Sequence, residues 1–467
     1  TSFKPNMDGE TSGSLIYRLS DETSIGQINL VQGETSGVKL SVRPTGESSF
    51  RDLGTLSGGL SQTVIPEDIA GVAEIKLTWG NVTPTFYELI TVPRAKVAES
   101  GGQASSEAET IPINSYYCTD CTIDFNENWK FNLGDVYGAS AKVYNDAAWR
   151  TVDLPHDYSV EGEYTTAGEA ESGYLIGGVG WYRKSFPVDP AWEGKTVTID
   201  FGGVYMDCEI YLNGTKLGEH HYGYSPFSFV LSNLDYEGEN VIAVKTDDAV
   251  PSSRWYSGAG IYRNVKLTVS ESVHVARYGT KVETTNAGAV TASTTIQNDG
   301  SSAANVTVKQ EIFELDGTTF EKKGAAVATD TASAASVTAN GTQVVTQNLT
   351  VASPKLWSSW DKGTPNLYVL VTTVQQGDTV LDTYETEFGF RTIEFTTDVG
   401  FKLNGENVKL KGVCQHHDQG ALGAEAWYRA LERQVEILKE MGCNSIRVTP
   451  TPAADALIEV WTRQGSM

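Results

Sequence analysis

Short segments in which apolar and polar residues alternate recur along most of this chain, and they constrain its fold more than any other feature. Two examples near the start are GVKLSVRP (37–44) and AEIKLTWG (73–80). Alternation with a period of two is typical of half-buried β-strands. Glycine and serine clusters separate such segments, and the 467 residues include 46 glycines but only 4 methionines. This combination favours strands joined by turns over helical bundles.

Changes in composition divide the first part of the chain into three regions. Residues 1–98 indicate a small accessory β-sandwich. Residues 99–110 (ESGGQASSEAET) contain no large apolar side chain, so we expect a flexible linker there. Residues 111–270 contain dense strand segments such as KTVTIDFGGV and NVIAVKTD, and Asn213-Gly214 is typical of a type I′ hairpin turn. The third region therefore predicts a sandwich of jelly-roll type.

A further β region covers residues 271–390 and is rich in Ala, Thr, Val and Ser. Asp299-Gly300 and Asp316-Gly317 mark expected turns between strands that follow one another about every ten residues. This spacing predicts an immunoglobulin-like sandwich.

The hydrophobic period changes in residues 391–467. FKLNGENVKLKGV predicts a hairpin around Asn404-Gly405, with LKGV as its second strand. AWYRALERQVEILKEMG and ADALIEVWTRQG have helical spacing, with Gly442 as the cap of the first helix, and NSIRVTP between them reads as a strand. The order βαβα is typical of the opening of a parallel α/β structure.

The charge balance excludes some partners. Lys and Arg number 35 against 59 Asp and Glu, which gives a formal net charge of −24. Neither nucleic acid nor an anionic membrane surface suits such a chain, whereas a neutral partner such as a sugar does. No apolar run is long enough to insert into a membrane, and the opening TSFKPNMDGE is no signal peptide, which suggests a mature or trimmed start.

Cys118 and Cys121 form a CxxC pair without two further zinc ligands nearby, so reduced or loosely paired thiols are favoured and no metal site is predicted.

Four stretches, in this order, resemble glycoside hydrolase family 2 of the β-galactosidase type. The first is NENWKFNLGD with WRTVDLPHDYSVEG, and the second is GVGWYRKSF with EIYLNGTKLGEHHYGYSPFSFVL and SRWYSGAGIYRNVKL. The third is LWSSWDKGTPNLYVL with FGFRTIEF, and the fourth is LKGVCQHHDQGALG with RALERQVEILKEMGCNSIRVT. The resemblance covers the chain from about residue 111 to its end. It implies a mainly β, multidomain chain: a jelly-roll sugar-binding domain and an immunoglobulin-like sandwich, then the first two β/α units of a (β/α)8 barrel.

The resemblance also implies a retaining glycosidase with two catalytic glutamates on later strands of the barrel. Such a barrel takes about 250 residues, and about 70 follow Thr397. We therefore expect no catalytic residue in this chain. The acidic residues near the first barrel helix are expected to face solvent on that helix, and they are Glu425, Glu432, Glu436 and Glu440.

Four residues are candidates for substrate binding by the same resemblance. His416 matches a histidine that lines the sugar site, at the C-terminal end of a barrel strand, and the alternative is a histidine that holds its loop. Arg254 lies on a loop that reaches toward the pocket, or it is a domain-interface arginine. Asp157 in LPHDY has a weaker claim, against an Asx-type turn. Arg447 would orient the nucleophile, or form a structural ion pair, or both.

The aromatic residues Trp181, Trp255 and Tyr256 could stack on sugar rings, but core or interface packing is the favoured interpretation. One departure from the family stands at Pro450, where a histidine usually follows IRVT. A degenerate catalytic half, a change of specificity and an uncertain sequence near the end of the chain all stay open.

The predicted function is the N-terminal part of a secreted or cell-surface exo-glycosidase that hydrolyses terminal β-galactosides, with this chain inactive by itself. The alternative is a non-catalytic carbohydrate-binding or adhesive surface protein derived from the family. A third hypothesis is a structural fragment made by proteolysis. The remainder of the barrel or a partner chain is expected to cover the open edge of the β/α units. No cofactor is required for the chemistry, and a structural magnesium or sodium ion stays open.

Overall fold

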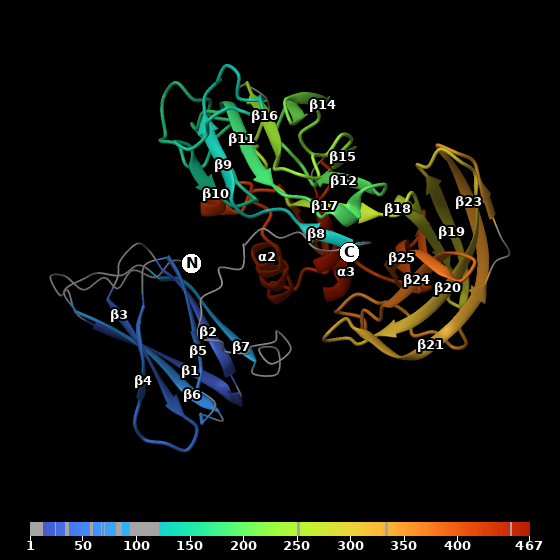
Figure 1. The fold of residues 1–467 in the computed structure, drawn as a ribbon. Coiled ribbons are helices and arrows are strands. Elements are labelled where there is room, and N and C mark those ends of the chain that lie inside the picture. The colour runs from blue at the N-terminus through green and yellow to red at the C-terminus, as the bar shows by residue number, and fades with distance from the viewer. Residues whose placement is uncertain are drawn as a thin grey trace. The chain divides into compact units, whose positions relative to one another are not determined.

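The computed structural model describes residues 13–23, 25–32, 37–56, 59–66, 68–69, 71–80, 86–93, 121–249, 253–331, 335–448 and 451–467. The chain divides into two compact units, Thr1–Ile111 and Pro112–Met467 (Figure 1). The predicted linker, residues 99–110, lies outside the described residues, as do Cys118 and Pro450.

The first unit is built from strands that pair in two sheets. The sheets have the orders β1-β6-β3-β4 and β5-β2-β7. Every second residue of β3 and alternate residues of β6 point into an apolar core, as the alternating sequence predicts. The strands are β1 (Gly13–Thr23), β2 (Ile25–Gln32), β3 (Val38–Pro44), β4 (Arg51–Leu56), β5 (Gly59–Val64), β6 (Val72–Trp79) and β7 (Phe86–Pro93).

The second unit begins with a sandwich of a six-stranded sheet, β10-β9-β11-β16-β13-β14, and a four-stranded sheet, β15-β12-β17-β8. Trp129, Phe186 and Trp192 are fully buried between them. Asn213 (φ 51°) and Gly214 (φ 89°) form the predicted turn between β13 and β14. The elements are β8 (Cys121–Asp124), β9 (Trp129–Leu133), β10 (Arg150–Val152), β11 (Gly178–Phe186), η1 (Pro190–Trp192), β12 (Thr196–Phe201), β13 (Cys208–Leu212), β14 (Thr215–His220), β15 (Phe227–Val230), β16 (Asn240–Asp248) and β17 (Val265–Ser270).

The immunoglobulin-like sandwich follows. Its sheets are β18-β19-β23 and β21-β20-β24-β25, with β22 paired to β20. Asp299-Gly300 separates β19 from β20 and Asp316-Gly317 follows β20, as predicted. The strands are β18 (Val273–Thr284), β19 (Ala289–Asn298), β20 (Ala304–Leu315), β21 (Lys322–Thr331), β22 (Ala335–Val337), β23 (Gly341–Thr350), β24 (Tyr368–Gln376) and β25 (Thr379–Phe388).

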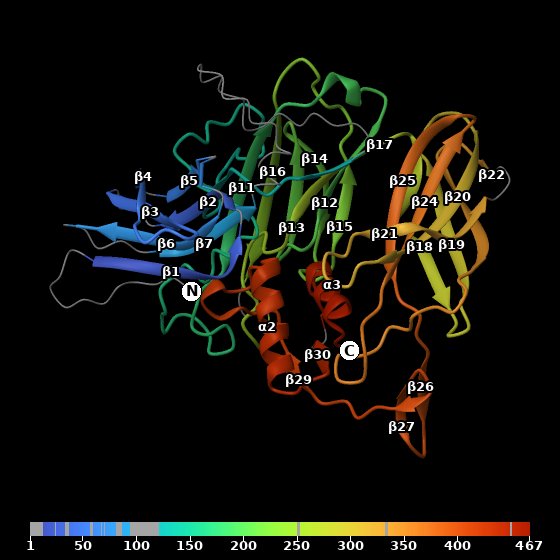
Figure 2. The same ribbon diagram turned by 90° about the horizontal axis from the view of Figure 1, so that it is seen from below.

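The last segment contains two β/α units. Strands β29 (Gly412–Gln415) and β30 (Ser445–Val448) pair in parallel, and helices α2 (Tyr428–Glu440) and α3 (Asp455–Gln464) pack together through Leu431, Val435, Leu457 and Val460 (Figure 2). The order βαβα is therefore confirmed. A short 3-10 turn, η2 (Gly420–Leu422), precedes α2. Gly442, with φ 85°, follows the end of α2 as expected of a cap.

One predicted pairing is wrong. The turn at Asn404-Gly405 exists, but it joins β27 (Gly400–Leu403) to β28 (Glu406–Asn407), and β27 also pairs with β26 (Ile393–Thr396). LKGV is not the second strand of this hairpin, because its Gly412 and Val413 belong to β29, which pairs with β30. β29 pairs instead with β30, which lies about 30 residues further along the chain. A local hairpin pattern cannot reveal such a distant partner.

Cys121 is disulfide-bonded, whereas Cys208, Cys414 and Cys443 are free. Within the part of the chain that the structure describes, no cluster of His, Cys, Asp and Glu could hold a metal ion. No described helix is long and apolar enough to cross a membrane.

Candidate functional site

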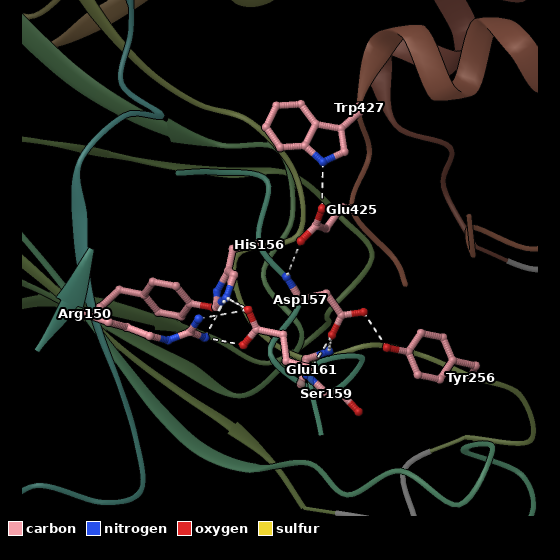
Figure 3. A network of polar contacts seen from close by, with 10 residues as sticks. Arg150, His156, Asp157, Ser159, Glu161, Tyr256, Glu425 and Trp427 are labelled. Carbon is pink, nitrogen blue, oxygen red and sulfur yellow. Dashed lines mark hydrogen bonds and ion pairs between the residues drawn. The ribbon is translucent and has the colours of Figure 1, made fainter. Parts of the chain in front are cut away.

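Asp157 is the centre of a polar contact between the jelly-roll domain and the segment that precedes α2. Its side chain is fully buried. Oδ1 accepts from the backbone N–H groups of Ser159 (3.0 Å) and Ala259 (2.9 Å). Oδ2 accepts from the N–H of Ala424 (2.8 Å) and from the hydroxyl of Tyr256 (2.5 Å). Figure 3 shows Asp157 with Ser159 and Tyr256. Four donors from three separate segments thus meet on one carboxylate. We call this arrangement the Asp157 clamp.

Two glycines make room for the clamp. A Cβ atom at Gly423 would lie 2.3 Å from Asp157 Oδ2, and one at Gly258 would lie 2.6 Å from the same oxygen. Gly423 also has φ 58° and ψ −131°, a conformation essentially restricted to glycine. Close approach of the two loops to the carboxylate therefore depends on both glycines.

Glu425 was expected to face solvent on the first helix, and this prediction is wrong. Helix α2 begins at Tyr428, so Glu425 precedes it. Its carboxylate accepts from Trp427 Nε1 (2.7 Å) and from the backbone N–H of Asp157 (3.3 Å), as Figure 3 shows. Burial raises the pKa of Glu425. The residue therefore adds a second polar link between the two segments that the Asp157 clamp joins.

A second group of polar side chains lies on the jelly-roll side of the clamp (Figure 3). His156 is buried and contacts the Tyr182 hydroxyl (2.7 Å) through Nδ1, and its Nε2 lies 3.2 Å from Glu161 and 3.1 Å from Arg150. Burial alone would raise the pKa of Glu161, but hydrogen bonds from His156 and Arg150 outweigh it and lower that pKa to about 2. The group holds the loop after β10 that carries Asp157.

His416 lies directly after β29, as the sequence predicts for the end of a barrel strand. Its ring is half-buried and lies 5.0 Å, between centroids, from the ring of Trp255. Trp255 Nε1 donates to the Tyr224 hydroxyl (3.1 Å), which fixes the indole. The loop between β16 and β17 therefore meets the end of β29 at His416.

Arg254, next to Trp255 on that loop, is exposed. Among the described residues its guanidinium has no hydrogen-bond or ion-pair partner. Trp181, by contrast, is buried in an apolar cluster, and Tyr256 belongs to the Asp157 clamp. These two residues pack in the core or at the contact between segments, as the favoured interpretation predicts.

His417 holds the loop rather than facing outward. Its Nε2 lies 2.7 Å from the carbonyl oxygen of Ser257, which can only accept, so Nε2 carries the proton. Burial lowers the pKa of His417. The neutral ring is thus oriented by one backbone contact while its neighbour His416 points to Trp255.

Arg447 lies on β30, paired in register with Cys414 of β29, and its Nη1 is 3.5 Å from Cys414 Sγ. The side chain is exposed, and it has no ion pair with a described carboxylate. His416 and the end of β30 are brought together, because His416 lines one small pocket with Val448 and Thr451.

The four predicted binding residues thus differ in what they offer. His416, Arg254 and Arg447 have polar atoms that a ligand could meet, and their contact with sugar stays a prediction. Asp157 has both oxygens occupied within the protein, so the geometry favours a role in positioning loops. The clamp donors at Ala259 and Ala424 are backbone groups far away in sequence, and no local pattern marks them.

Comparisons with known proteins agree with this architecture. Residues 125–271 match the glycosyl hydrolases family 2 sugar binding domain, and residues 273–391 match a second domain of glycosyl hydrolases family 2. The chain belongs to glycosyl hydrolases family 2.

Its relatives include Beta-galactosidase BoGH2A from Bacteroides ovatus, which is 43% identical over 350 residues, 73% of this chain and 40% of that protein. A beta-glucuronidase from Formosa agariphila is 29% identical over 380 residues, 74% of this chain and 37% of that protein. A crystal structure of a family 2 member from Bacteroides cellulosilyticus superposes with a TM-score of 0.69 at 34% identity, covering 74% of this chain and 45% of that one. The chain therefore spans less than half the length of these relatives.

Proposed function

We propose that this chain is the N-terminal part of a retaining exo-glycosidase that hydrolyses terminal β-galactosides. The observation that carries the proposal is the position of His416, at the carboxyl end of β29 and against Trp255 of the Arg254 loop. Active sites of β/α barrels lie at the carboxyl ends of the strands. Similarity to a protein named beta-galactosidase supports the sugar assignment.

In this proposal His416 and Arg254 bind sugar hydroxyls. An imidazole can both donate and accept a hydrogen bond, and a guanidinium donates several. Arg447 would orient a carboxylate across the pocket, because a planar fork of donors suits a carboxylate. Asp157 would act through the clamp, by holding the Arg254 loop and the segment after β29 in one geometry.

We further propose that both catalytic glutamates are supplied by polypeptide outside residues 1–467. A retaining mechanism needs two carboxyl groups about 5–5.5 Å apart, one as acid/base and one as nucleophile. Two carboxylates of the contact beside the Arg254 loop already have partners: Asp157 accepts from four donors and Glu425 accepts from two. Both carboxylates are therefore engaged within the protein, which favours a positioning role for them over a catalytic one.

The described parallel sheet of the β/α segment has two strands, β29 and β30. Parallel sheets are normally covered on both faces and continue to further strands. We propose that further β/α units or a partner chain cover it. We also propose secretion or a cell-surface location, which suits the disulfide bond at Cys121, because disulfides persist in oxidising compartments.

The proposal predicts that residues 1–467 alone release no nitrophenol from 4-nitrophenyl β-D-galactoside above the buffer rate, because the chain lacks both glutamates. The measurement is a continuous absorbance assay, run in parallel with the β-D-glucuronide and a family 2 β-galactosidase as positive control. Release of nitrophenol from the galactoside by the purified chain would contradict the assignment of the glutamates. Release from the glucuronide alone would also overturn the sugar assignment.

A further inference from the structure

A groove of about 660 Å³ is lined by residues of the jelly-roll domain, the immunoglobulin-like sandwich and helices α2 and α3. We call it the junction groove. Its floor is the outer face of β8, β12 and β17, and its walls come from β18, β25 and the starts of α2 and α3. Neither His416 nor Trp255 lines it. Its volume falls in the range of sites that bind small molecules, about 300–1,000 Å³.

The floor presents polar groups in two rows across the strands. The rows are Asp200–Lys266–Asp124 and Thr198–Thr268–Thr122. The hydroxyls of Thr122 and Thr268 lie 3.4 Å apart, and Thr268 is 3.5 Å from an oxygen of Asp200. Threonine hydroxyls donate and accept, carboxylates accept and the ammonium donates, so the floor matches a ligand that carries many hydroxyl groups.

The walls add aromatic rings to this polar floor. Tyr278 of β18, Tyr384 of β25 and Tyr428 at the start of α2 line the groove from its opposite sides. Tyr278 is 58% exposed, and its hydroxyl donates to Asp455 of α3 (2.7 Å), which holds the ring at the groove wall. Rings with an apolar face and a polar edge suit a ligand whose surface alternates between C–H and O–H groups.

The charges of the groove select among such ligands. Its lining contains more acidic than basic side chains, namely Asp124, Asp200, Asp382, Asp455 and Glu459 against Arg263, Lys266 and Arg277. Asp200 is paired with Arg277 at 2.5 Å. An anionic glycan would therefore be repelled. The described acidic residues form no group that could hold a metal ion, so a cation is not matched either.

We propose that the junction groove binds a neutral oligosaccharide at a site separate from the His416 pocket. The floor hydrogen-bonds the sugar hydroxyls, and the tyrosine rings contact the C–H faces of the sugar rings. Such a site would hold a glycan chain on the protein independently of hydrolysis, so it does not rest on the β-galactosidase proposal.

The test begins with a glycan array of neutral and anionic oligosaccharides probed with residues 1–467, followed by calorimetry with the best neutral binder. Tyr278→Ala and Tyr428→Ala are each expected to weaken binding at least tenfold. Tyr278→Phe keeps the ring but loses the hydrogen bond to Asp455 that holds it at the groove wall, so we expect an affinity between that of the parent chain and that of Tyr278→Ala. Tyr137→Ala, at a fully exposed tyrosine outside the groove, is the matched control and should leave affinity unchanged.

His416→Ala separates this proposal from the galactoside pocket, because groove binding should persist in that variant whatever its effect on galactosides. Thermal unfolding of each variant reports whether it is folded. If an alanine variant does not fold, the affinity of Tyr278→Phe is compared with that of the parent chain instead. The proposal is overturned if no neutral oligosaccharide binds, if only anionic glycans bind, if binding survives both tyrosine substitutions, or if binding disappears with His416→Ala.

Discussion

Replacing Asp157 by alanine is expected to loosen the contact between the jelly-roll domain and the segment before α2, at a cost of about 3–5 kcal/mol. The substitution leaves the N–H groups of Ser159, Ala259 and Ala424 without their acceptor. A buried donor without a partner costs about 1–3 kcal/mol, and entry of water keeps the total below the sum. Few single substitutions have effects this large.

Hydrogen exchange of the folded chain, read by mass spectrometry, measures this loss locally. Peptides that contain Ala259 and Ala424 should exchange about 100-fold faster or more in Asp157→Ala, since 1.4 kcal/mol corresponds to tenfold. Asp153→Ala is the matched control, because Asp153 is exposed and accepts from one backbone N–H, that of Asn128 (2.8 Å). If exchange in Asp157→Ala equals that in Asp153→Ala, the clamp does not hold the two segments together.

Gly423→Ala is expected to disrupt the same contact from its other side, by about 4 kcal/mol. The added methyl group would lie 2.3 Å from Asp157 Oδ2 and 2.8 Å from Val160 Cβ. Backbone strain at this glycine-only conformation contributes about 1–3 kcal/mol, and overpacking contributes about 1–3 kcal/mol more.

Gly420→Ala separates the two terms, because Gly420 also has a positive φ (65°) but a Cβ there would meet nothing within 4 Å. We expect this control to lose about 1–2 kcal/mol through strain alone. Chemical unfolding followed by tryptophan fluorescence compares the variants. Combining Gly423→Ala with Asp157→Gly should cost less than the sum of the two single losses, because the overlap disappears with the carboxylate. Equal losses in Gly420→Ala and Gly423→Ala would show that close packing on Asp157 is unimportant.

Local sequence signals predicted the parts of the fold that depend on near neighbours. Asn213-Gly214 adopts its turn because both residues tolerate positive φ, and the alternation in β3 and β6 places one face of each strand in the core. The start of α2 was misplaced because its N-cap, Trp427, makes no capping hydrogen bond through its side chain. The helical pattern therefore predicts Glu425 on a solvent-facing helix, whereas α2 begins three residues later, at Tyr428.

The contacts that build the candidate site join residues far apart in sequence. Ala259 and Ala424 are 102 and 267 residues from Asp157. Both donate through the backbone N–H, which every residue except proline has, so the residue types at these positions do not indicate the contact. The strong local turn signal at Asn404-Gly405 likewise predicted LKGV as a hairpin strand, although Gly412 and Val413 pair with the distant strand β30. Resemblance to a family placed His416 at the end of a strand, but only the folded chain shows that Trp255 lies against it.

We propose that residues 1–467 are part of a retaining β-galactosidase whose nucleophile is supplied by polypeptide outside these residues. A retaining enzyme forms a covalent glycosyl intermediate, so a 2-deoxy-2-fluoro-galactosyl fluoride should trap it. The direct measurement is peptide mass spectrometry after treatment of the protein from its natural source and of residues 1–467. We expect a label on a glutamate outside residues 1–467 in the natural protein and no label on the isolated chain. A fluorogalactosyl label on any aspartate or glutamate within residues 1–467 would contradict it.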